Sequence, residues 1–180
     1  MSYIYRRFRP ETDTRKPFDC GDADLNGFLV ETTVHTPNAL QYEKEMLAVT
    51  YVIEDVDNQE ILAYFSLLHD KIERTFSDRT IWNRLSRHIP NAKRRSSYPA
   101  LKIGRLAVCR KAQKTGLGRE ILSFIKAWYY KHPKAGCRYI TVDAYRQAEK
   151  FYSNCHFKRL SETLPEEETV LMYYDLKVIR

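Results

Sequence analysis

Gln113-Lys114-Thr115-Gly116-Leu117-Gly118 stands between a strand pattern over residues 100–108 and a helix pattern over residues 117–131. Glycines let the backbone turn sharply between two elements and approach a ligand closely. Consecutive amides at the amino end of a helix attract phosphate oxygens, and the adjacent Lys114 and Arg119 add positive charge. The hexapeptide therefore predicts an anion-binding turn, with a plain strand–helix turn as the alternative that a short Gly-x-Gly leaves open.

The spacing of this turn and of the cysteines and histidines excludes several familiar sites. The hexapeptide is neither GxxxxGK[ST] nor GxGxxG within a βαβ unit, which disfavours a Walker-type nucleotidase and a dinucleotide fold. Cys20, Cys109, Cys137 and Cys155 form no CxxC pair, and the five histidines show no HExxH spacing. We therefore expect free, mostly buried thiols, no metal and a reducing, cytoplasmic location.

Around the turn, the hydrophobic pattern predicts one α+β domain over residues 1–180, built on a single sheet. The helix over 117–131 carries its apolar side chains at i, i+1, i+4, i+7 and i+8, and a second helix begins near Asp22, a plausible N-cap. Residues 69–98 are polar and basic, and we expect a surface excursion with a short helix near 81–85. The other expected elements are strands over 2–8, 46–53, 61–68, 139–142, 157–160 and 169–176, and a helix over 146–154.

Charge is distributed unevenly along the chain. The formal net charge is +7, yet residues 1–70 hold 6 basic and 13 acidic side chains, while residues 71–134 hold 17 basic and 3 acidic ones. So basic a segment, which includes Lys93-Arg94-Arg95, suits an anionic partner such as a nucleotide cofactor or nucleic acid, or else forms a solvated face. No apolar run is long enough to span a bilayer, and the first residues lack the apolar core of a secretory signal.

A second motif gives the turn its meaning. Phe151-Tyr152-Ser153-Asn154-Cys155-His156-Phe157 begins 33 residues after Gly118. Together with Gly104-Arg105-Leu106-Ala107-Val108 and the turn itself, this segment resembles the GCN5-related N-acetyltransferase (GNAT) superfamily. Its pyrophosphate loop reads Gln/Arg-x-x-Gly-x-Gly/Ala, and its later segment reads Phe-Tyr-x-x-x-Gly-Phe. His156 replaces the glycine of that segment, at a position where positive φ is expected.

The resemblance implies a GNAT-like fold, a mixed and mostly antiparallel sheet with flanking helices and a splayed central strand pair. It also implies acetyl transfer from acetyl-CoA, a cosubstrate, to a primary amine that attacks the thioester directly, with no metal. Tyr152 would be the general acid that protonates the leaving thiolate. The main chain of Leu106 and Val108 would bind the pantetheine arm. The acetyl-CoA contacts implied by the resemblance are Leu106, Ala107, Val108, Gln113, Lys114, Thr115, Gly116, Leu117, Gly118, Arg119 and Asn154.

The acceptor stays open at this point. An unidentified primary amine is the general expectation, and the alternative is the amino group of aminoacyl-tRNA, because Phe18 to Leu29 and Gly104 to Val108 also resemble acetyltransferase toxins. A non-catalytic binding module is a third hypothesis. Asp70, Glu45 and Asp143 are candidate bases beside water, and Asn154 could equally cap its helix. Tyr129, Tyr130, Tyr173 and Tyr174 belong either to a partner surface, such as a homodimer interface, or to the core.

Overall fold

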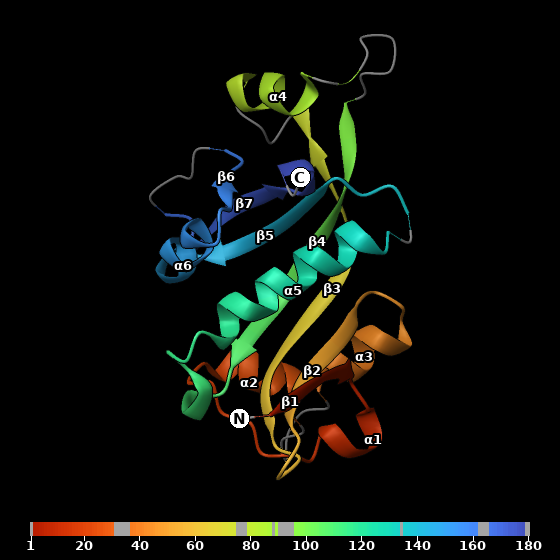
Figure 1. Ribbon diagram of the computed structural model, residues 1–180, viewed down its shortest axis with the longest axis vertical. Coiled ribbons are helices and arrows are strands. Elements are labelled where there is room, and N and C mark those ends of the chain that lie inside the picture. Colours follow the sequence, from red (N-terminus) through yellow and green to blue (C-terminus); the bar gives the residue numbers. More distant parts are fainter. Residues whose placement is uncertain are drawn as a thin grey trace. The chain divides into compact units, whose positions relative to one another are not determined.

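The computed structural model describes residues 2–30, 37–74, 79–87, 89, 96–133, 135–161 and 166–178. The chain divides into two compact units. Figure 1 shows the helices and strands of both units. Unit 1 comprises Met1–Leu68 and Ile103–Leu122, and unit 2 comprises His69–Lys102 and Ser123–Arg180. The long elements β3 (Ile61–Glu73), β4 (Ser97–Val108) and α5 (Leu117–Lys131) contribute to both units.

Unit 1 is built on an antiparallel meander, and three short helices lie in its described amino-terminal part. Strand β1 (Tyr3–Arg7) pairs with β2 (Val49–Asp55), which pairs in turn with β3. The helices are α1 (Pro10–Asp13), α2 (Ala23–Leu29) and α3 (Asn38–Lys44). The Asp22 side chain accepts a hydrogen bond from the Leu25 amide at 3.0 Å, which confirms the predicted N-cap of α2. Phe18, Phe28 and Tyr64 stack in the core of this unit.

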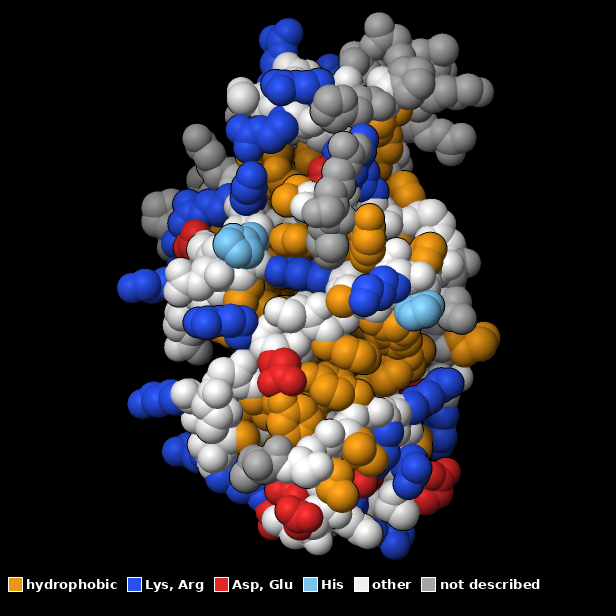
Figure 2. All heavy atoms as spheres, viewed as in Figure 1, with side chains coloured by type: hydrophobic (Ala, Val, Ile, Leu, Met, Phe, Trp, Pro, Cys, Tyr) orange, Lys and Arg blue, Asp and Glu red, His pale blue; other side chains and the backbone are white. Residues whose placement is uncertain are grey.

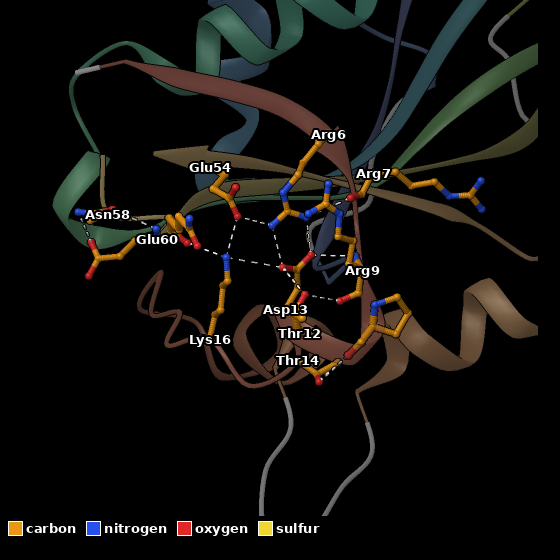
Figure 3. Close-up of polar contacts among 12 residues, drawn as sticks. Arg6, Arg7, Arg9, Thr12, Asp13, Thr14, Lys16, Glu54, Asn58 and Glu60 are labelled. Atoms are coloured by element: carbon orange, nitrogen blue, oxygen red, sulfur yellow. Dashed lines mark hydrogen bonds and ion pairs between the residues drawn. The ribbon is translucent and has the colours of Figure 1, made fainter. Parts of the chain in front are cut away.

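A buried ion-pair network fixes α1 to the sheet of unit 1 (Figure 3). Arg6 donates from both terminal nitrogens to the Asp13 carboxylate at 2.7 Å and also binds Glu54. Lys16 donates to Glu54 at 2.7 Å. The Asp13 side chain is fully buried, so its charge depends on these partners and on the Arg9 amide at 2.7 Å. The network thereby holds the segment that leads from β1 toward α2.

Unit 2 combines the start of β4 with β5 (Tyr139–Tyr145), β6 (Lys158–Arg159), β7 (Thr169–Asp175) and helices α4 (Arg79–Ser86) and α6 (Glu149–Asn154). Strands β5 and β7 are antiparallel, whereas Ala100–Lys102 of β4 pair in parallel with Tyr139–Thr141 of β5. This pairing ends at Lys102, while β4 continues to Val108. The strands follow the hydrogen-bonded order β1-β2-β3-β4-β5-β7-β6, which confirms the expected mixed, mostly antiparallel sheet.

Several local expectations were wrong. Strand β2 begins at Val49, because Met46 takes a φ of 55° in a turn after the unpredicted helix α3. Residues 69–98 are no mere surface excursion, since β3 extends to Glu73 and Trp82 and Leu85 are buried among Tyr98, Tyr139 and Tyr173. The expected strand over 157–160 is reduced to two residues. The expected helix over 146–154 does form, with a 3-10 turn over its first three residues.

The other open points are settled in part. Tyr173 and Tyr174 are buried core residues, whereas Tyr130 is exposed. Cys155 is buried, and the other three cysteines are half-buried free thiols. Lys93-Arg94-Arg95 lie outside the described residues. Across the residues that are described, no helix is long and apolar enough to cross a membrane, and no group of three potential metal ligands occurs.

Candidate active site

The end of β4 presents the three residues that the resemblance places at acetyl-CoA. Because side chains alternate along a strand, Ala107 points into the core of unit 1, where it is 4% exposed. The neighbouring Leu106 and Val108 are half-buried on the opposite face. The role predicted for these two residues is a main-chain one, and it stays a prediction.

The turn between β4 and α5 is shaped for close approach by a ligand. Lys114 and Gly116 have φ values of 63° and 97°, so two of these three consecutive residues have positive φ. A Cβ atom on Gly116 would meet no atom within 4 Å, which leaves open space in front of this residue. The Thr115 hydroxyl donates to the Ala112 carbonyl at 2.8 Å and fixes the turn from behind. Helix α5 begins directly after it, at Leu117.

The electrostatics of this turn favour an anion. The first amides of a helix have no acceptor within the helix, and the helix dipole adds partial positive charge there. Lys114, Gly116 and Arg119 are exposed around that end of α5. The residues present therefore fit a pyrophosphate group, which main-chain amides and the flanking cations would hold.

Gln113 has a different environment from the rest of the loop. Its side-chain amide donates to the carbonyl oxygens of Cys20, at 2.8 Å, and Val108, at 2.9 Å. It therefore braces the segment before α2 against the end of β4. A direct contact between Gln113 and acetyl-CoA stays a prediction.

The same brace is reinforced by Asp19, which lies one residue before Cys20. Its carboxylate accepts hydrogen bonds from Asn26 at 3.0 Å and from the Gly21 amide at 2.8 Å, and pairs with Arg110 at 3.0 Å. These hydrogen bonds, that of Asn26 first, lower the pKa of Asp19. A Cβ at Gly21, whose φ is 93°, would press on the Arg110 side chain at 3.1 Å. The sequence pattern Phe18-Asp19-Cys20-Gly21 is thus a tight turn fastened to the loop-bearing strand.

Tyr152 lies in unit 2, on α6. Its side chain is 6% exposed, and its ring packs edge-on against Phe151 and Phe157 at centroid distances of 5.1 and 5.5 Å. Burial, the largest cause, raises the pKa of the Tyr152 phenol well above its usual value. The phenol therefore keeps its proton at neutral pH, as a general acid must.

The end of α6 carries two further residues from the sequence motif. Asn154 is the last helical residue and is exposed. His156 has a φ of 66°, so the residue that replaces the family glycine does adopt the left-handed conformation. The turn forms despite the substitution.

Lys126 is a buried cation that sequence reasoning missed. It is 8% exposed, and its Nζ donates to the Cys155 carbonyl at the end of α6. The rings of Tyr174 and Phe157 cover this nitrogen at 3.9 and 4.9 Å. Burial lowers the pKa of Lys126. The available signal was its place on the apolar stripe of α5, four residues after Leu122.

The three candidate bases are in different states. Asp70 accepts a hydrogen bond from the Thr141 hydroxyl, and Asp143 pairs with Lys102 at 2.5 Å. Glu45 is exposed at the end of α3 in unit 1. None of these environments singles out a base for an amine.

The structure gathers the predicted loop and strand residues, from Leu106 to Arg119, in unit 1, and it places Tyr152 and Asn154 together on α6 in unit 2. Each half of the predicted site is thus formed on its own.

Comparison with solved structures shows the same fold along nearly the whole chain. A tyrosine-to-phenylalanine mutant of KacT is 22% identical with a TM-score of 0.78, and the match covers 99% of this chain and 98% of that one. AtaT complexed with acetyl-methionyl-tRNAfMet is 21% identical with a TM-score of 0.75, over 99% and 97% of the two chains. AtaTR bound with acetyl-CoA is 20% identical with a TM-score of 0.73, over 98% and 95%.

A family model described as an acetyltransferase (GNAT) domain matches residues 88–177, half of the chain, and this range includes both motifs. The chain therefore belongs to the GNAT family of acetyl-CoA-dependent acetyltransferases.

Proposed function

We propose that this enzyme transfers the acetyl group of acetyl-CoA to the α-amino group of an aminoacyl-tRNA. The observation that carries the choice of acceptor is the extent of the likeness. The family model matches residues 88–177, whereas the likeness to AtaT complexed with acetyl-methionyl-tRNAfMet covers 99% of the chain and so includes the amino-terminal half. The family's cosubstrate binds at the turn after β4, which leaves that half to serve the acceptor.

The turn and the first residues of α5 bind the pyrophosphate of acetyl-CoA in this proposal. The amides from Thr115 to Gly118 supply hydrogen bonds, and Lys114 supplies a flexible cation at the rim. Gly116 permits the approach because nothing occupies the space beside its Cα. The Val108 amide then faces the thioester oxygen, where a hydrogen bond stabilises the charge that develops during attack.

The reaction balances with one proton donor and one proton acceptor. The lone pair of the neutral amine attacks the thioester carbonyl carbon, so a C–N bond forms and the C–S bond breaks. Tyr152 donates its phenolic proton to the leaving sulfur, which departs as the thiol of CoA. The amine loses its extra proton to water, and a second proton from water restores the phenol.

The test offers labelled acetyl-CoA to the purified protein with charged tRNA, uncharged tRNA and a panel of small primary amines. We expect label on charged tRNA and none on uncharged tRNA. Tyr152→Phe should lose at least about 100-fold in transfer rate, the usual scale of acid catalysis, while acetyl-CoA affinity is unchanged. Tyr130→Phe is the matched control. Tyr130 is 47% exposed and lies outside the motif, and the substitution removes the same hydroxyl oxygen there.

Two results would overturn the proposal. Label on a small amine with none on charged tRNA would make this a small-molecule acetyltransferase. Equal losses of transfer rate in Tyr152→Phe and Tyr130→Phe would remove the assigned role of Tyr152.

Expression of the active enzyme in a bacterial host should also arrest growth, and Tyr152→Phe should relieve that arrest.

A further inference from the structure

Helix α4, in unit 2, has one face with positive charge only. Its outward residues are exposed and include Arg79, Asn83 and Arg84, and the exposed Arg87 follows its last residue. Arg79 and Asn83 are four residues apart, so they lie one above the other along the helix. In Figure 2, Lys and Arg side chains gather over the helix that Figure 1 labels α4. The described helix contains no acidic residue.

The opposite face of α4 is anchored in the core of unit 2. Trp82 stacks on Tyr98 with ring centroids 5.0 Å apart and planes 15° from parallel. Leu85 is 2% exposed, and its carbonyl accepts hydrogen bonds from the Tyr139 hydroxyl at 2.9 Å and from Arg138 at 3.3 Å. The helix is therefore a fixed support, and its arginines are presented from a defined backbone.

The arginines of α4 differ in their partners from the basic side chains that lie in ion pairs elsewhere in the fold. Arg6, Arg138 and Lys102 each pair with a carboxylate within 2.7 Å. Among the residues that the structure describes, Arg79, Arg84 and Arg87 form no ion pair, and Arg84 instead donates to the Tyr173 hydroxyl. Three guanidinium groups on one small surface, to which the described part of the chain supplies no counter-charge, repel one another, so the surface favours a polyanion.

We propose that the outward face of α4, formed by Arg79, Asn83, Arg84 and Arg87, binds the phosphate backbone of RNA; this inference rests on the proposed function and adds a contact surface to it. Guanidinium forks match phosphate oxygens in two hydrogen bonds, and Asn83 adds an amide donor in the same row. A phosphate backbone offers regularly spaced charges along a line, as the helix does. The contact is independent of base sequence.

The first experiment measures binding of an unacylated tRNA to the full-length protein between 50 and 200 mM salt. The test variant carries Arg79→Gln, Arg84→Gln and Arg87→Gln. Three phosphate contacts account for about 2.1 to 2.7 units of the salt slope, so the affinity of the unmodified protein should fall about 20- to 40-fold more over this range than that of the variant. The loss of affinity should be the same for tRNAs of different sequence.

A charge-matched control separates the surface from the overall charge. It neutralises three exposed basic side chains of unit 1 for which the described residues supply no ion pair: Arg9→Gln, Arg15→Gln and Lys44→Gln. Both triple variants have the same net charge, and we expect the control to bind tRNA like the unmodified protein. Circular dichroism and thermal midpoints of both variants establish that they are folded.

The second measurement distinguishes this inference from the proposed function. If both hold, the α4 variant raises the KM for aminoacyl-tRNA at least tenfold, with the KM for acetyl-CoA unchanged. If tRNA binding depends on α4 but no acetyl transfer to charged tRNA occurs, the inference stands and the proposed function fails. If the α4 variant and the control have equal tRNA affinity and salt slope, the inference is wrong. Polyglutamate, a model of an acidic protein partner, is a second binding probe. If the α4 variant loses polyglutamate binding but keeps tRNA binding, the inference is also wrong, and the surface binds an acidic protein partner instead.

Discussion

Replacing Arg6 by methionine should destabilise unit 1 far more than the same change one residue later. Arg6 is 10% exposed and makes a two-pronged contact with Asp13, whose side chain is fully buried, as well as binding Glu54. Methionine fills similar space without charge, so the buried carboxylate loses its main partner. Breaking a buried pair from one side costs roughly 3–5 kcal/mol.

The structure places the expected cost near the lower end of that range. Lys16 remains between the two carboxylates, with its Nζ 3.9 Å from Asp13 and 2.7 Å from Glu54. The Arg9 amide also still donates to Asp13. We therefore expect the free energy of unfolding to fall by about 3 kcal/mol, which lowers the melting temperature by roughly 6–12 °C in a chain of this size.

Arg7→Met is the matched control. Arg7 lies in the same strand, but its side chain is 61% exposed and pairs with Glu43 at 2.6 Å. Exposed pairs contribute at most about 1 kcal/mol. Urea unfolding followed by circular dichroism measures both variants, and Arg6→Met combined with Asp13→Asn should recover part of the loss. Equal destabilisation by Arg6→Met and Arg7→Met would refute the assignment of the network as the anchor of α1.

Three further predictions concern acid stability and two backbone positions. Hydrogen bonding from Arg6, the largest cause, lowers the pKa of Glu54 from 4.5 to about 2. The contribution of Glu54 to stability is therefore complete above about pH 4.5 and is lost as the pH falls toward 2. Glu54→Gln should make the free energy of unfolding less dependent on pH in that window. Gly116→Ala, at a φ of 97°, should raise the KM for acetyl-CoA about tenfold through strain of about 1–2 kcal/mol. Gly27→Ala, within α2, should leave this KM unchanged. Equal KM values in the two variants would contradict the role of the turn. His156→Gly should raise the free energy of unfolding by up to about 1 kcal/mol, because His156 has a φ of 66°, and an unchanged thermal midpoint would show that this position carries no strain.

The sequence predicts the elements with strong local patterns. Helix α5 begins and ends at the predicted residues, because the signals that define it, its apolar stripe and the glycine before it, are local in sequence. The Asp22 cap and the left-handed turn at His156 are likewise local effects. Helix α4 was underestimated, because Trp82 and Leu85 are isolated apolar residues among polar ones and find their partners in β4 and β5.

Features that depend on distant partners could not be predicted. Gln113 matches the family motif, yet its side chain binds the Cys20 carbonyl, 93 residues away in sequence. The network of Arg6, Asp13 and Glu54 joins three segments that hold unremarkable charges in sequence. The position of Lys126 on the apolar stripe of α5 indicates burial, but the rings that cover its nitrogen, Phe157 and Tyr174, are known only from the fold. The partners of these side chains are known only once the fold brings the distant segments together.

The chemical position of the transferred acetyl group distinguishes acetylation of aminoacyl-tRNA from acetylation of any other amine. Charged tRNA is incubated with the enzyme and acetyl-CoA, the aminoacyl ester is then hydrolysed, and the released amino acid is identified by mass spectrometry. We expect an N-acetyl amino acid, formed by the unmodified enzyme and the Tyr130→Phe control and strongly reduced with Tyr152→Phe. Release of the unmodified amino acid alone, with the acetyl group of acetyl-CoA found on another amine, would contradict this expectation.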